Sequence, residues 1–522
     1  MRKTLFISLP GVEIGSIIET QITTEYKDSA PFNMSEAFRR FSCPVKQRTV
    51  IVNAPTQLKL STAVFQNGVL ANSFAQAHQN NITETFVSEN NRAIWTWKAQ
   101  NQEAIPEEPN TPSLFLFTPV VFCSAGNWTQ ITQGLKTAFM EKSVSGEQVK
   151  KVADGLRKLS KEEQLRGVNT FVSRSLNSVG PYFARLPLSC LTLPDTTISE
   201  GYGHGADCAI VAYTLLKELG FEPEYVFVGP SRRDDAFKSL YASPSMELFG
   251  RVRVRVVHDG VAWWFNDQNQ YADIRAASVE HCHALTLDGK VSRISVLPQY
   301  SSQRMITYDI GIQDDGTATL NMTSIISGTN FGAQAKYYQE LTPEYRRRDY
   351  LALLKNLSQR AVASSELTTE FSKYPGRISF GCKIPQFAVV DGDFLYCRLP
   401  VEVFKAMPMK LQENRQMPFE YGGFDNVTLT VNITLPPTFR KVVMAPESYE
   451  WLAPEGNAYP VADGAASAGK YQISAVHGDG TLTLVYHAEL VPEVVFPEKF
   501  APYEALSKKL SHAAVNTLLL SR

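Results

Sequence analysis

Apolar and polar positions alternate with a period of two in short runs over the first quarter of the chain. The runs lie at 49–52, 58–65, 93–97 and 114–117, and turns that are polar or contain proline or glycine separate them. This pattern is typical of strands that bury one face. It predicts a β-rich N-terminal domain over residues 1–140. Its first strand is expected to start near Met1, with the opening part of the domain missing.

The spacing of apolar residues changes to a helical period near residue 145. Apolar residues between 149 and 159 predict one helix, and Ser160 with Glu163 has the capping-box pattern that starts a second helix. An apolar helix is then predicted to begin at Cys208, with Asp207 as its N-cap, and to end before Gly220. Strands at 225–228, 250–257 and 261–265 follow, so an α+β central domain is predicted over residues 141–300.

Strand patterns return after residue 300. They lie at 305–312, 318–326, 427–435 and 480–487, with a helical stretch at 343–363 and an amphipathic helix at 503–517. We therefore expect a β-rich C-terminal domain with a terminal helix over residues 301–522. The predicted fold class is α+β, with a central domain between two β-rich domains.

Composition and charge exclude several classes of protein. The 51 Lys and Arg residues nearly balance the 52 Asp and Glu residues, so the chain has no general attraction for nucleic acid. The longest apolar stretch, residues 114–123, is about half the ~20 residues that a membrane-spanning helix requires. The apolar run at the N-terminus ends at Pro10, which is too early for a signal peptide. The seven cysteines contain no Cys-x-x-Cys pair, so neither a disulfide framework nor a four-cysteine zinc site is predicted.

Cys208 is the strongest candidate for chemistry. It follows a glycine-rich segment and begins the predicted apolar helix. Unpaired backbone N–H groups and the positive end of the helix dipole favour a thiolate at such a position. A nucleophilic cysteine also needs a base and a group that orients the base. The alternative is a small buried hydrophobic residue at a helix start, which is a common role of free cysteine.

The segment Gly203-His-Gly-Ala-Asp-Cys208, together with the apolar helix after it, resembles the nucleophile segment of the bacterial transglutaminase-like superfamily. This resemblance implies a papain-like central domain, in which a strand with His and the next strand with Asp complete a triad. Residues 5–19 resemble part of an uncharacterised β domain that precedes such domains in exported bacterial proteins, and the tail resembles their C-terminal β domain. A periplasmic or extracellular location is implied, although no signal peptide is predicted.

The chain departs from the family pattern at both partners of the cysteine. An ungapped comparison places Arg251 where the family has its histidine and Asn266 where it has its acid. Arginine stays protonated and cannot act as a general base, although it stabilises a nearby thiolate. Asp267 is a shifted candidate for the acid, but neighbouring strand residues point to opposite faces, so it is expected to project away.

Four other histidines offer weaker alternatives for a base or a metal ligand. His204 precedes Cys208 in the glycine-rich loop and would have to fold back, and His258 lies at the far end of the strand that holds Arg251. His281 and His283 share a face if they lie in a strand. Because no third ligand follows with suitable spacing, neither a metal nor any other cofactor is predicted.

Two further groups of side chains, a tryptophan pair and three arginines on one strand, need an interpretation. Trp263 and Trp264 indicate core packing. Arg251, Arg253 and Arg255 share one face of their strand, which indicates either a solvated surface or an anion site beside Cys208.

Three hypotheses for the function follow. The first is a degenerate transglutaminase-like protein, a pseudoenzyme without amide acyl transfer that serves as a binding or structural module for peptide, protein or cell-envelope ligands. The second is an active cysteine acyltransferase or peptidase that uses Cys208 with a base from an unaligned histidine or from a partner. The third is a thiol-reactive or redox role for Cys208 beside Arg251.

Overall fold

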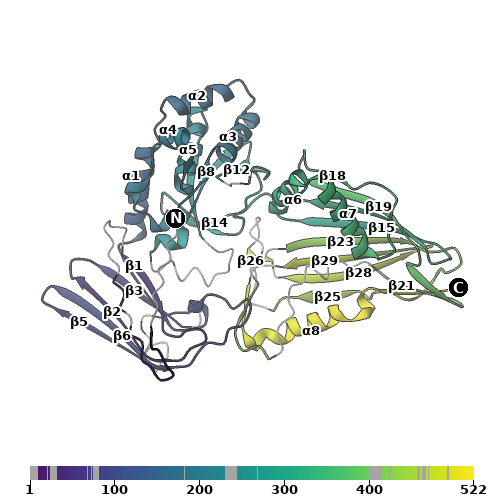
Figure 1. Cartoon of the computed structure of the whole chain (residues 1–522), viewed down its shortest axis with the longest axis horizontal. Helices are drawn as coiled ribbons and strands as arrows, with labels where there is room; N and C mark the ends of the chain where they lie inside the picture. The colour runs from purple at the N-terminus through teal and green to yellow at the C-terminus, as the bar shows by residue number, and fades with distance from the viewer. Residues whose placement is uncertain are drawn as a thin grey trace.

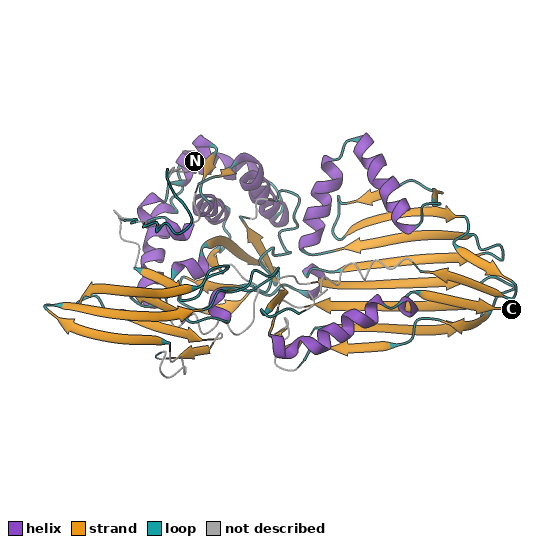
Figure 2. Ribbon diagram, turned by 60° about the horizontal axis from the view of Figure 1, so that its bottom comes forward, coloured by secondary structure: helices purple, strands orange, loops and turns teal. Residues whose placement is uncertain are grey.

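The chain is described from a computed structural model, which shows a mixed α+β protein with many antiparallel strands (Figures 1 and 2). The structure describes residues 10–19, 21–23, 32–66, 69–71, 73, 81–180, 183–229, 241, 244–266, 269–399, 414–421, 425–454, 459–460, 466–467, 469–490 and 493–522. The first strand expected near Met1 lies outside these residues.

The N-terminal region consists of two antiparallel sheets that pack on a small shared core. One sheet has the order β1-β7-β3-β4 and the other the order β2-β6-β5. The core includes Phe38, Val121 and Trp97, which is fully buried. The strands are β1 (Asn33–Ala37), β2 (Val45–Pro55), β3 (Leu60–Gln66), β4 (Val69–Ala71), β5 (Ile82–Glu89), β6 (Arg92–Gln102) and β7 (Val120–Ala125).

Two expectations for this region are wrong. Residues 114–117 are not a strand, because Leu114–Leu116 form a 3-10 helix in which Phe115 and Leu116 are buried. A helix, α1 (Trp128–Lys142), begins well before residue 140. Asn127 and Gln130 form a capping box at its start, and Ile131, Leu135 and Phe139 bury one face.

The central region packs helices against one face of a five-stranded antiparallel sheet (Figure 1). The buried helix α5 (Gly205–Glu218) lies at its centre, and every side chain from Ala206 to Leu216 is buried. The strand order is β12-β11-β10-β13-β14. The other elements are α2 (Glu147–Leu156), α3 (Lys161–Ser175), α4 (Pro194–Glu200), β10 (Glu224–Val228), β11 (Arg251–His258), β12 (Val261–Phe265), β13 (His283–Thr286) and β14 (Val291–Arg293).

Several local predictions for this region are confirmed. Ser160 and Glu163 form both hydrogen bonds of the capping box that starts α3. Gly220 follows the end of α5 with a φ of +79°, the left-handed conformation that favours glycine. The turn between β11 and β12 contains Asp259 and Gly260, as the pattern predicted.

The C-terminal region has a nine-stranded sheet, and β15 and β23 are parallel neighbours within it. Helices α6 and α7 lie near β15 and β19, and α8 runs beside β25 and β28 (Figure 1). A second sheet has the order β20-β21-β31-β24. The main elements are β15 (Arg304–Ile312), β16 (Ala318–Ile326), α6 (Thr329–Glu340), α7 (Pro343–Leu357), β19 (Gly376–Ile384), β20 (Ala388–Asp391), β21 (Phe394–Arg398), β23 (Asp425–Thr434), β24 (Lys441–Met444), β25 (Tyr449–Leu452), β28 (Lys470–Gly478), β29 (Thr481–Leu490), α8 (Phe500–Ser511) and β31 (Thr517–Ser521).

Both helices predicted in this region end earlier than expected. The helix predicted over 343–363 ends at Leu357, and the terminal helix ends at Ser511, so that residues 517–521 form a strand. None of the helices among the described residues combines the length and apolarity that crossing a bilayer requires.

The central and C-terminal regions meet at Arg275. Its guanidinium donates two hydrogen bonds to the buried Asp273 carboxylate, at 2.8 and 2.6 Å. The same guanidinium lies 5.5 Å from the ring centre of Trp263, 4.6 Å from that of Tyr300 and 5.8 Å from that of Tyr374. Tyr374 belongs to the C-terminal region, so the ion pair with Asp273 holds Arg275 within the central region while its cation–π contact with Tyr374 reaches the other.

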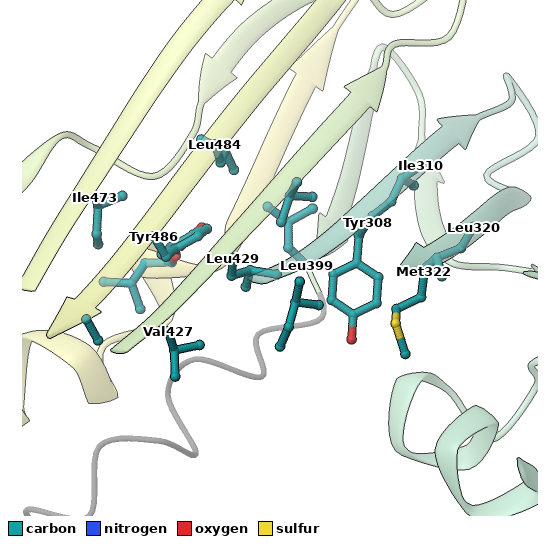
Figure 3. Packing of buried hydrophobic residues seen from close by; sticks show 14 of the residues in the cluster. Tyr308, Ile310, Leu320, Met322, Leu399, Val427, Leu429, Ile473, Leu484 and Tyr486 are labelled. Atoms are coloured by element: carbon teal, nitrogen blue, oxygen red, sulfur yellow. The ribbon is translucent and has the colours of Figure 1, made fainter. Parts of the chain in front are cut away.

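Apolar side chains from neighbouring strands fill the C-terminal core (Figure 3). Leu429 on β23 lies opposite Tyr486 on β29, and both are fully buried. Tyr486 donates a hydrogen bond from its hydroxyl to the Val515 carbonyl at 3.0 Å. Tyr471 is equally buried, but its hydroxyl has no hydrogen-bond partner among the described residues.

This contrast predicts opposite effects of removing the two hydroxyl groups. Tyr486→Phe removes a buried hydrogen bond and leaves the Val515 carbonyl without its donor, so we expect a loss of about 1 kcal/mol of unfolding free energy. Tyr471→Phe removes a buried polar atom that has no partner, so we expect no loss or a small gain. Urea unfolding of both variants measures the difference. Equal losses would contradict the assignment of the hydrogen bond.

Candidate functional site

The helix α5 begins three residues earlier than predicted, because His204 and not Asp207 is its N-cap. The Nδ1 atom of His204 accepts hydrogen bonds from the backbone N–H groups of Ala206 and Asp207, at 3.1 and 3.3 Å. The Asp207 carboxylate accepts the His204 backbone N–H at 3.1 Å, which completes a capping box. Histidine is not a typical N-cap residue, so the sequence pattern gave no clear signal for it.

The Asp207 carboxylate also connects the start of α5 to the preceding loop. Its Oδ1 atom accepts the backbone N–H of Thr192 at 2.9 Å, and its Oδ2 atom lies 3.3 Å from Nε2 of His204. The side chain is almost fully buried, at 2% exposed. Since Nδ1 of His204 is an acceptor, the neutral ring carries its proton on Nε2, which is buried and makes no hydrogen bond among the described residues.

Cys208 is therefore the fourth residue of α5, and it lies inside the protein at 2% exposed. Burial, and after it the negative charge of Asp207, raise the pKa of its thiol to about 11 against a backbone hydrogen bond that lowers it. Among the described residues, no other side chain forms a hydrogen bond with this thiol. The helix start was expected to favour a thiolate here, but burial and the charge of Asp207 outweigh the backbone hydrogen bond and favour the neutral thiol.

Arg251 does not lie beside Cys208. Along β11, Val252 and Val254 face α5 and share a core with Cys208. Arg251 pairs with Val228, which belongs to the core on the other face of the sheet. The Arg251 guanidinium donates a hydrogen bond to the Gly229 carbonyl and contacts the Cys282 sulfur at 3.4 Å.

The other arginines of β11 share that opposite face, as their alternation predicted. Arg255 forms an ion pair with Glu224, with 2.5 Å between Nη2 and Oε2. The expected anion site beside Cys208 is therefore wrong, because these side chains extend from the other side of the sheet.

Asn266 does lie close to the start of α5. Its side-chain amide donates to the Gly205 carbonyl at 2.6 Å and to the Val252 carbonyl at 2.9 Å. The residue has a φ of +71° and is 4% exposed. Its Oδ1 atom is buried and accepts no hydrogen bond from the described residues. Asp267, the shifted candidate, lies outside the described residues.

The remaining histidines lie at other places in the central region. His258 ends β11 and its ring contacts Phe221, with 6.0 Å between the ring centres. His281 has a φ of +65° and lies beside Glu280, and His283 begins β13 with its ring 5.3 Å from that of Tyr241. Within the described ranges, no three His, Cys, Asp or Glu side chains are grouped to hold a metal ion.

The two tryptophans pack in different cores. Trp263 lies in the core that contains Cys208, and Trp264 lies on the opposite face of the sheet. Both are buried, and Arg166 and Arg275 lie over the Trp263 ring. The prediction of core packing is confirmed.

Comparisons with known proteins show similarity in two places. The model of a domain of unknown function, DUF3857, matches residues 2–106, the region of the two N-terminal sheets. No curated protein matches the chain significantly. The crystal structure of a putative protease from Parabacteroides distasonis is similar to this chain, with a TM-score of 0.57 and 14% identity over 94% of this chain and 75% of that one. At this identity, the likeness shows a shared fold.

Proposed function

We propose that the chain is a degenerate transglutaminase-like protein of three domains. In this proposal it binds peptide or cell-envelope ligands without catalysing amide acyl transfer. The observation that carries the proposal is the isolation of the Cys208 thiol, which is buried, has a raised pKa and forms no hydrogen bond with another side chain among the described residues. Attack on an amide requires a thiolate, a base and an acid for the leaving amine.

Asn266, which takes the place of the family's acid, supports the same proposal. In a papain-like site, the oxygen of the third group accepts a hydrogen bond from the imidazole N–H of the base and so orients the ring. Here the amide oxygen of Asn266 is buried and lacks a donor among the described residues, whereas its NH₂ group is bonded to two backbone carbonyls. This arrangement is what we expect where an orienting group remains and its imidazole is absent.

The alternative is an active cysteine enzyme whose base is His204. The shared fold with the putative protease is the observation in its favour. The geometry of His204 argues against it, because a neutral imidazole accepts a proton at its unprotonated nitrogen, and Nδ1 already accepts two backbone N–H groups. A proton on Nδ1 would break both hydrogen bonds of the helix cap.

The third hypothesis required Arg251 to lie beside Cys208 and stabilise its thiolate, and this contact is not formed. The arginine lies on the other face of the sheet and contacts Cys282.

We expect no Cys208-dependent turnover of amide substrates. Wild type and Cys208→Ala would release ammonia from benzyloxycarbonyl-glutaminyl-glycine, and fragments from fluorescein-labelled casein, at the same background rate. The reason is that a positioned general acid and base contributes roughly 10²–10⁴-fold to such reactions, and none contacts this thiol. Turnover by the wild type that Cys208→Ala abolishes would establish the active enzyme instead.

The rate at which each cysteine is alkylated should increase with its exposure and with the fraction of it present as thiolate. At about pH 7.5, a thiol with a pKa near 11 is ionised in only roughly one molecule in 10³–10⁴, so Cys208 should react with iodoacetamide long after the exposed Cys43 and Cys190. Its rate should still rise with pH between about pH 8 and 10. Peptide mapping by mass spectrometry measures the order, and early labelling of Cys208 near pH 7 would contradict the proposal.

His204 should behave as a helix cap and not as a base. His204→Ala removes an acceptor from the start of α5, so we expect a loss of about 0.5–2 kcal/mol of unfolding free energy. His204→Asn keeps a side-chain acceptor and should restore most of that loss. Denaturant unfolding of the two variants measures the effect. A His204→Ala variant as stable as the wild type would show that the cap contributes nothing to the unfolding free energy.

A further inference from the structure

A pocket of about 400 Å³ lies in the central region, between α1 and the segments 183–189 and 244–246. Asn33 of β1 also lines it, so the N-terminal region contributes to its wall. Phe183 stands between the pocket and the start of α5, because it lines the pocket and its ring centre is 6.3 Å from that of His204. The volume is within the range of roughly 300–1,000 Å³ that ligand pockets commonly have.

The lining of this pocket is apolar and uncharged. Ile131, Leu135 and Phe183 belong to the buried core of the region, and Leu188 and Met246 pack against that core. The polar side chains in the described lining are Asn33, Gln130, Ser189 and Ser245, and none of the described lining residues carries a charge. A charged ligand group would lose its hydration here without gaining a charged partner among the described lining residues, so this lining favours a neutral apolar group.

Gly134 keeps the pocket open from the side of α1. Ile131, Gly134 and Leu135 lie on one face of the helix and all line the pocket. A Cβ atom at Gly134 would meet only Leu188 Cδ1, at 3.9 Å, so a larger side chain would enter the pocket. Glycine is one of the least favourable residues in a helix interior, and at this position the missing side chain leaves space that alanine or leucine would occupy.

We propose that this pocket binds an uncharged apolar side chain of a peptide, of the size of leucine or phenylalanine. This inference rests on the proposed binding function and specifies its ligand. The apolar wall takes the side chain. The oxygen atoms of Gln130 and Ser245 already accept backbone N–H groups, so the Gln130 NH₂ group and the Ser245 hydroxyl hydrogen are left to donate to the peptide C=O groups on either side of it, which an alkyl chain does not have.

The test uses the full chain and the uncharged fluorophore N-phenyl-1-naphthylamine, whose emission rises in apolar surroundings. We expect saturable binding, displaced by acetyl-Ala-Phe-Ala-amide or its Leu analogue but not by the Asp and Lys analogues. Gly134→Leu should weaken binding of the fluorophore at least about tenfold, because the new side chain occupies the volume that the ligand needs.

The matched control is Gly155→Leu. Gly155 also lies in a helix, α2, but a Cβ atom there would meet nothing within 4 Å, so binding should be unchanged. Gly134→Ala should also weaken binding, but by less, because alanine is smaller than leucine. Since alanine has a higher helix propensity than glycine, this variant should fold even if Gly134→Leu does not.

Three results would overturn the proposal. They are unchanged binding in the Gly134 variants, displacement by decanol but by no peptide, and equal displacement by charged and uncharged peptides. Failure of the proposed function would look different, because it would appear as Cys208-dependent cleavage of an amide. The Cys208→Ala variant should bind the fluorophore and the peptides as the wild type does.

Discussion

The buried carboxylate of Asp207 is the interaction on which the central region depends. A buried charge is tolerated only when hydrogen bonds compensate its lost hydration, and Asp207 obtains them from His204 and from Thr192. These bonds come from both sides of α4, so one side chain fixes the loop before α5 and the first turn of α5 at once. The helix that they start provides the centre of the core, because almost all of its side chains are buried.

The same interaction determines the chemistry of Cys208. A negative charge on the preceding residue opposes a thiolate, and so does the exclusion of water around the helix. The imidazole that could have acted as a base serves as a helix cap. His204 and Asp207 are therefore both engaged in the cap of α5, next to the thiol of Cys208 in the sequence.

Much of the fold could be predicted because it follows from local patterns. The strand over Ala318–Ile326 and the capping box of Ser160 and Glu163 are encoded within a few residues. Helix α1 was missed although it starts with a capping box, because Thr and Gly residues weaken its helical pattern. The pair Asn127 and Gln130, followed by apolar residues at helical spacing, was the sequence pattern that could have predicted this helix.

The candidate site was harder to predict, because the side chains that lie near Cys208 depend on which face of the sheet packs against α5. The valines and arginines of β11 alternate, and α5 packs on the valine face, so Arg251 had to lie on the other side. Reading this alternation together with the apolar character of α5 would have separated Arg251 from Cys208. The acceptor role of His204 depends on ring orientation, which residue spacing does not specify.

The position of Arg275 has a consequence for how the molecule transmits strain. Its guanidinium is held by a buried carboxylate of the central region and is surrounded by rings from both sides of the boundary. A rotation of one region against the other would separate an ion pair from its aromatic surroundings and expose apolar ring faces to water. Arg275 is therefore one of several contacts through which a force on the C-terminal sheet reaches the sheet beneath α5, together with the hydrogen bond from the Tyr374 hydroxyl to the Gln299 carbonyl and the packing of Tyr271 against the C-terminal core.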